Sequence, residues 1–99
     1  MYAVLYQFDV TKGQEEQFET LWQHVTEAFM IHAGGLGSRL HKNEMGSFIA
    51  YAQWPDKMTW ESAKQKLPES ALDNLQQMQE SCNSITVVFQ MTVQNDLLK

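Results

Sequence analysis

The chain has 99 residues and an acidic balance, with seven Lys and Arg against twelve Asp and Glu and a formal net charge of -5. The basic residues are scattered and form no run. Nucleic-acid backbones and anionic membrane surfaces attract clustered positive charge, so neither is expected as a partner. No apolar run has the length of a membrane span, and the first ten residues lack the basic start of a signal peptide. We therefore expect one soluble, cytoplasmic domain over residues 1–99.

The cysteine and aromatic content bear on how so small a domain is stabilised. The single Cys82 cannot form an intrachain disulfide and is expected to be a small, partly buried apolar residue. Three Trp, three Tyr, five Phe and six Met are many for a chain whose core must be modest. Some of these side chains should line a pocket or a subunit interface.

The first third of the chain predicts a strand followed by a long helix. Over Met1–Val10 both alternating faces are apolar, so both need cover. Thr11 and Gln14 have the spacing of a capping box, which predicts the start of the helix. Apolar residues then recur at helical spacing, and Gly34-Gly35 is expected to end the helix.

The next segment predicts a β-hairpin. Leu36–Lys42 and Ser47–Trp54 have the composition of strands, and Asn43–Gly46 joins them with a glycine suited to a positive φ. Arg39, His41, Tyr51 and Trp54 are expected to lie close together in this hairpin.

The last third predicts two helices and a final strand. Asp56 can cap a short helix over Lys57–Lys66, and a second helix should run from Pro68 to about Cys82. The apolar face of the second helix is expected to comprise Leu72, Leu75 and Met78. Ser84–Gln94 shows the strongest period-two alternation in the chain and predicts the last strand.

The order strand, helix, strand, strand, helix, strand is that of the split, ferredoxin-like βαββαβ arrangement. It predicts an α+β fold in which a four-stranded antiparallel sheet carries its helices on one face. The other face also needs cover, so two such sheets are expected to pack face to face in a homodimer that forms a barrel.

Short motifs spread over nearly the whole chain are similar to those of one known family. They are Phe8-Asp9-Val10-Thr11-Lys12-Gly13, then Glu16, Phe18 and Trp22, then Gly35-Leu36-Gly37-Ser38-Arg39-Leu40-His41, and Tyr51-Ala52-Gln53-Trp54-Pro55. On these motifs the chain resembles the antibiotic biosynthesis monooxygenase family of the dimeric α+β barrel superfamily. The resemblance implies a relation to cofactor-free oxygenases that act on quinols and aromatic polyketides, and a more distant one to haem-degrading enzymes.

Of the branches of this superfamily, the haem-degrading enzymes resemble this chain least. The resemblance would require an Asn on the first strand, where the nearest residue is Gln7, and a His ligand on the second helix. No His follows His41, so the expected axial ligand is missing. His24 and His32 are too far apart along one helix to form a metal pair. We therefore expect neither a haem, nor a metal, nor any other cofactor.

Two polar residues are candidate catalytic groups. His41 has a side chain suited to proton transfer near neutral pH, although a strand His often has no such role. Arg39, two residues away on the same face, would hold an oxyanion or a substrate carboxylate, or else pair with an acidic residue across the dimer.

Four aromatic residues are candidate substrate-binding groups. Tyr6, Tyr51 and Trp54 lie on strand faces or near strand ends where a pocket between helices and sheet would open, and Trp22 lies on the apolar helix face. Packing in the core is the alternative explanation for each of them.

The function hypothesis is a cofactor-independent monooxygenase-like protein that acts on a small aromatic, quinol or polyketide-type substrate. In this chemistry the substrate itself is the reductant, and the protein supplies an apolar pocket, a base or hydrogen bond for the phenol, and polar groups for developing charge. The alternative is a non-catalytic module on the same fold that binds a small ligand or a partner.

Overall fold

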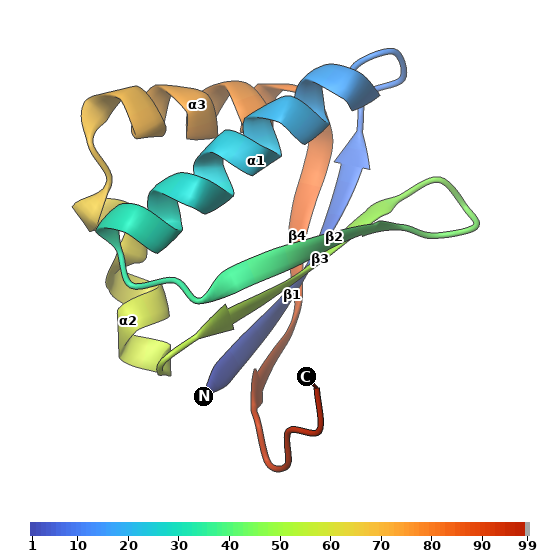
Figure 1. Ribbon diagram of the computed structural model, residues 1–99. Coiled ribbons are helices and arrows are strands. Elements are labelled where there is room, and N and C mark those ends of the chain that lie inside the picture. Colours follow the sequence, from blue (N-terminus) through green and yellow to red (C-terminus); the bar gives the residue numbers. More distant parts are fainter. Residues whose placement is uncertain (99) are drawn as a thin grey trace.

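The computed structural model describes residues 1–98, and their helices and strands follow the predicted order (Figure 1). The elements are β1 (Tyr2–Val10), α1 (Glu15–His32), β2 (Gly37–Lys42), β3 (Phe48–Trp54), α2 (Lys57–Ser62), the 3₁₀ segment η1 (Ala63–Lys66), α3 (Glu69–Glu80) and β4 (Cys82–Thr92). Cys82 is a partly buried free thiol, as expected, but it opens the last strand instead of ending the helix.

The four strands form one antiparallel sheet in the order β2-β3-β1-β4. Helices α1 and α3 lie side by side across one face of this sheet, and α2 lies at its end beside the last residues of β3 (Figure 1). This is the predicted ferredoxin-like α+β fold. We call the covered side of the sheet the helix face and the other side the far face.

The core lies between the helix face and the helices, in two neighbouring clusters. One surrounds Phe18, which is fully buried, and the other surrounds Val4 and Trp54. Tyr6 and Phe29 are only partly buried, and they pack against both clusters. The alternation along β1 and β3 explains the arrangement, because every second residue of each strand faces the helices.

Local signals at the ends of the helices are partly confirmed. Gly34 adopts a φ of +78° after α1, as the helix end required. Asp56 caps α2, where the backbone N–H of Thr59 donates to its carboxylate at 2.8 Å. This bond lowers the pKa of the Asp56 carboxyl. The capping box is wrong, because the Thr11 hydroxyl donates to the side chain of Asn83 in β4 and the start of α1 has no side-chain cap.

Two predicted apolar faces need correction. Leu72 is 37% exposed on α3, and the small Ala71 is buried in its place. In β4 the partner of Leu5 is Phe89 and the partner of Tyr6 is Val87, so a β-bulge leaves Val88 as an extra residue. The bulge reverses the alternation. Phe89 therefore lies on the far face with Leu5, although the uninterrupted alternation predicted it on the same face as Ile85.

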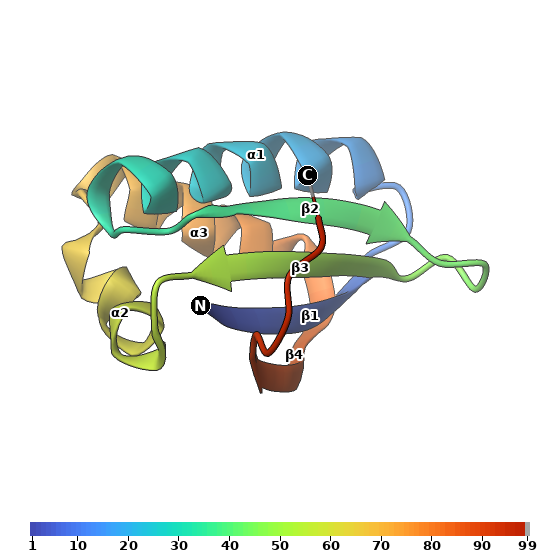
Figure 2. The same cartoon turned by 60° about the horizontal axis from the view of Figure 1, so that its bottom comes forward.

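The far face is open in the single chain. Phe89 is 57% exposed there, and the segment that follows β4 crosses β3 and β2 on this side, bringing Leu98 against the sheet (Figure 2). Among residues 1–98, no helix combines the length and apolar character that a membrane crossing requires.

Candidate functional site

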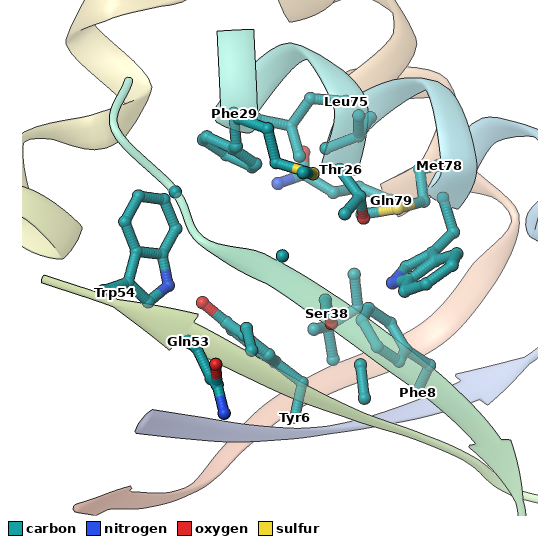
Figure 3. A pocket seen from close by; sticks show the side chains of 18 residues that line it. Tyr6, Phe8, Thr26, Phe29, Ser38, Gln53, Trp54, Leu75, Met78 and Gln79 are labelled. Atoms are coloured by element: carbon teal, nitrogen blue, oxygen red, sulfur yellow. The ribbon is translucent and has the colours of Figure 1, made fainter. Parts of the chain in front are cut away.

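A pocket of about 180 Å³ lies between the helix face of the sheet and helices α1 and α3 (Figure 3). We call it the inner pocket. A cavity of about 150 Å³ holds a benzene ring, so this volume suits one aromatic ring with its substituents. Most of its wall is apolar. The aromatic walls are Tyr6, Phe8, Trp22, Phe29 and Trp54.

The pocket contains few polar groups. They come from both layers: Thr26 of α1, Ser38 of β2 and Gln79 of α3. Gln53 of β3 borders the pocket, but its amide donates to the Tyr51 hydroxyl on the far face. Apart from the Tyr6 phenol, no ionisable side chain among residues 1–98 lines this pocket. The inner pocket therefore matches the general form of a small-molecule site, in which apolar walls surround a few fixed polar groups.

Trp54 places an unpaired hydrogen-bond donor beside the pocket. Its side chain is 4% exposed and packs edge-on against Phe29, with ring centroids 5.6 Å apart. The indole Nε1 atom is buried and has no hydrogen-bond partner. Figure 3 shows this nitrogen on the side of the ring that faces the pocket. A buried donor without an acceptor costs about 1–3 kcal/mol, so a ligand oxygen placed here would recover that cost.

Tyr6 supplies a second donor. The indole N–H of Trp60 donates to the Tyr6 hydroxyl oxygen at 2.7 Å, which leaves the phenolic proton free to point elsewhere. Burial raises the pKa of Tyr6, against the opposing effect of the bond from Trp60. The phenol is therefore neutral at physiological pH and can donate a hydrogen bond, but it is not a base.

The inner pocket continues into a more open groove under α2 and η1, which we call the mouth groove. Both share Tyr6, Phe29, Trp54 and Leu75. The mouth groove adds Trp60 and Gln90 together with three charged residues. The charged residues are Lys57, Glu61 and Lys64. The part of a ligand that does not fit in the inner pocket can lie in the mouth groove, next to these charged side chains.

Arg39, His41 and Tyr51 lie together on the far face. Arg39 pairs with Tyr51 and His41 with Ile49 across the β2–β3 ladder, and all four line one open groove that Leu98 also contacts. We call it the far-face groove. The Nδ1 atom of His41 lies 3.2 Å from the carbonyl oxygen of Ile49.

The structure thus divides the predicted site residues between two places. Tyr6, Trp22 and Trp54 line the inner pocket, whereas Arg39, His41 and Tyr51 line the far-face groove. The expectation that Trp54 lies with the other three is wrong, because an odd separation along β3 puts it on the opposite face from Tyr51. The two sites meet only at their border, where both contact Gly37, Ser38 and Gln53.

Sequence reasoning missed Thr26, Met30 and Gln79, three pocket residues that helical spacing indicates. Trp22, Thr26 and Met30 follow one another at four-residue intervals on α1, and Leu75 and Gln79 do so on α3. Thr26 and Gln79 are the polar members of these stripes. A polar residue within an otherwise apolar helix stripe is the signal that would have found them.

Metal ligands are not gathered anywhere in the part of the chain that the structure describes. No group of three or more His, Cys, Asp or Glu side chains lies close enough to hold an ion within residues 1–98. The lining of the inner pocket contains none of these four residue types.

Comparison with known proteins identifies the family. The profile of the antibiotic biosynthesis monooxygenase family matches residues 1–80, and the chain belongs to this family. SnoaB, a cofactor-independent oxygenase from Streptomyces nogalater, superposes with a TM-score of 0.76 at 16% identity, over 99% of this chain and 97% of that one.

Other solved structures extend the likeness. A protein from Mycobacterium tuberculosis has a TM-score of 0.72 at 11% identity, over 98% of each chain. A protein from Arabidopsis thaliana has a TM-score of 0.76 at 9% identity, over 99% of this chain and 100% of that one. At such identities these structures show a common fold. Among curated protein sequences, no significant match is found.

Proposed function

We propose that this protein is a cofactor-independent monooxygenase that binds a small aromatic, quinol or polyketide-type substrate in the inner pocket. The observation that carries the proposal is the buried Trp54 Nε1–H, which lacks a partner and lies beside an apolar pocket of about one-ring size. Membership of the family and the fold shared with SnoaB support the same reaction class.

The chemistry would depend on hydrogen bonding instead of a base in the protein. A phenol must lose its proton before it gives electrons to oxygen, and hydrogen bonds to the anionic form lower its pKa. Trp54 and Tyr6 would donate to the phenolate oxygens in a site that excludes most water, where such bonds are strongest. The substrate SH₂ then reacts with O₂ to give SO and water, so the substrate supplies all four electrons.

Oxygen uptake tests this proposal. The protein is incubated with a panel of hydroquinones and phenolic polyketides, and uptake above the buffer rate is expected, with one atom of ¹⁸O₂ in the product. The Trp54→Phe variant should lose most of the rate. His41→Ala and Arg39→Ala test whether the far-face groove takes part, as the sequence hypothesis requires. Uptake that never exceeds the buffer rate across the panel would contradict the proposal.

A ligand-binding module without catalysis is the second candidate. The observation that favours it is the absence of His, Asp, Glu, Lys or Cys from the lining of the inner pocket, which leaves no group that takes up a proton near neutral pH. A thermal-shift screen under air distinguishes the two. A ligand that stabilises the protein and is recovered unchanged supports the module, and turnover of that ligand removes it.

We also propose that two copies pack through their far faces into a barrel. Leu5, Ile49, Tyr51, Phe89 and Met91 give this face a continuous apolar surface in a chain that is otherwise acidic. A symmetric dimer would cover it and would enclose Arg39 and His41 between subunits. Their predicted catalytic roles, and the cytoplasmic location, stay predictions.

A further inference from the structure

We propose that the ligand of the inner pocket carries a negatively charged substituent, such as a carboxylate, which Lys57 and Lys64 recognise at the mouth. This inference rests on the proposal that the inner pocket binds an aromatic ring. It adds a substrate class and two specificity-determining residues, Lys57 on α2 and Lys64 on η1.

The first argument is the division of space. The inner pocket, at about 180 Å³, accepts one ring with small substituents, and its apolar lining offers no counter-charge. A larger ligand can extend past Tyr6 and Trp54 into the mouth groove, because these side chains line both spaces. A charged group buried in the inner pocket would be strongly penalised, whereas the same group in the mouth groove stays hydrated.

The second argument is the distribution of charge. The chain has a net charge of -5 and seven Lys and Arg, yet two of those seven line the mouth groove. Both are exposed, and within residues 1–98 neither forms an ion pair with a carboxylate inside 4.0 Å. Glu61 is the one acidic residue of this groove, so the groove has an excess of one positive charge. The acidic chain as a whole repels anions, whereas the local positive charge of this opening attracts one.

The third argument is reach. Lysine carries its ammonium group on a flexible four-carbon stem, so Lys57 and Lys64 can follow a substituent of variable length. Neither side chain offers the planar fork of an arginine. The site is therefore expected to recognise the charge of the substituent more than its shape.

The test compares two ligands that differ only in charge. We choose 2,5-dihydroxyphenylacetate and its methyl ester, titrated calorimetrically without oxygen so that neither is oxidised. The acid is expected to bind about three to ten times more tightly than the ester at low ionic strength, because exposed pairs of this kind are weak individually. This preference should shrink at about 0.5 M salt, where the Debye length of about 4 Å is close to the ion-pair distance.

Matched variants locate the effect. The double variant Lys57→Gln with Lys64→Gln should bind acid and ester equally. The control double variant, Lys12→Gln with Lys66→Gln, removes the same charge from two lysines that do not line the groove, and should keep the preference. The single change Glu61→Gln should increase it.

The outcomes separate this inference from the proposed function. Equal binding of acid and ester by the unmodified protein, or an equal loss of preference in both double variants, overturns the anionic substituent but leaves the aromatic site in place. Failure of the ester and of every neutral hydroquinone in the panel to bind would overturn the site itself, and the inference with it.

Discussion

The two faces of the sheet use aromatic residues in opposite ways. On the helix face, Phe48 and Trp54 are buried and leave a small pocket with an unpaired donor in its wall. On the far face, Phe89 is exposed, and the half-buried Tyr51 lies with Arg39 and His41 in an open groove. Both surfaces come from the same strands at alternating positions. The comparison indicates that the many aromatic residues of one chain can supply both a ligand site and an interface. Whether a strand residue occupies an odd or an even position decides which face it lies on.

The largest expected effect concerns the far face. Phe89→Asp should convert the proposed dimer into a monomer and raise the dissociation constant by at least about 100-fold. In a two-fold symmetric interface the substitution occurs twice, so two carboxylates would be buried. Light scattering measures the change. Met45→Asp, in a turn residue that is 92% exposed, is the control and should leave the assembly intact. A monomeric unmodified protein at micromolar concentration would contradict the dimer.

The next effect concerns the inner pocket. Trp54→Phe keeps an aromatic ring but removes the Nε1–H, so a hydroquinone should bind about three- to tenfold more weakly, as the loss of one hydrogen bond requires. The three indole N–H resonances of the ¹⁵N-labelled protein report the contact directly, and that of Trp54 should shift when ligand is added. Trp22→Phe is the matched control, since Trp22 also lines the pocket but its indole nitrogen is not a buried donor without a partner. Equal losses in the two variants would contradict a specific role for Trp54.

The sequence alone predicts which residues of one strand share a face of the sheet. Period-two alternation along residues 47–54 separates Tyr51 from Trp54 without any structure. The register of the hairpin is harder, because a shift of one residue would have moved Arg39 and His41 to the helix face. The observed register pairs His41 with Ile49 and depends on how the turn closes at Asn43, whose side chain accepts from Ser47 N–H at 2.9 Å.

Two features could not be predicted because they depend on contacts between distant segments. The bulge at Val88 lies within an apolar run, Val87-Val88-Phe89, that shows no sign of an extra residue. The unpaired state of Trp54 Nε1 depends on the groups that other elements place around the indole. Tyr6 was predicted as a ligand contact, but its bond to Trp60 spans 54 residues and has no local signal.

The smallest expected effect concerns the hydrogen bond between Trp60 and Tyr6. Tyr6→Phe removes the acceptor of the Trp60 indole N–H, and should lower the free energy of unfolding by about 1 kcal/mol at pH 7. Urea unfolding measures it. Tyr51→Phe, which removes a hydroxyl from the far face, is the comparison and should change stability by less than about 0.5 kcal/mol.

The Tyr6→Phe variant should also change how the free energy of unfolding depends on pH, which a simple loss of packing would not do. Burial raises the pKa of Tyr6 in the folded protein above the ordinary value of about 10, so the unfolded chain gives up this proton first as the pH rises. The contribution of Tyr6 to stability is therefore complete below about pH 10 and is lost as the pH rises towards the folded-state pKa. The stability of the unmodified protein should therefore fall more steeply with pH than that of Tyr6→Phe above about pH 10. Parallel curves would contradict the raised pKa of Tyr6 and the burial of its phenol that causes it.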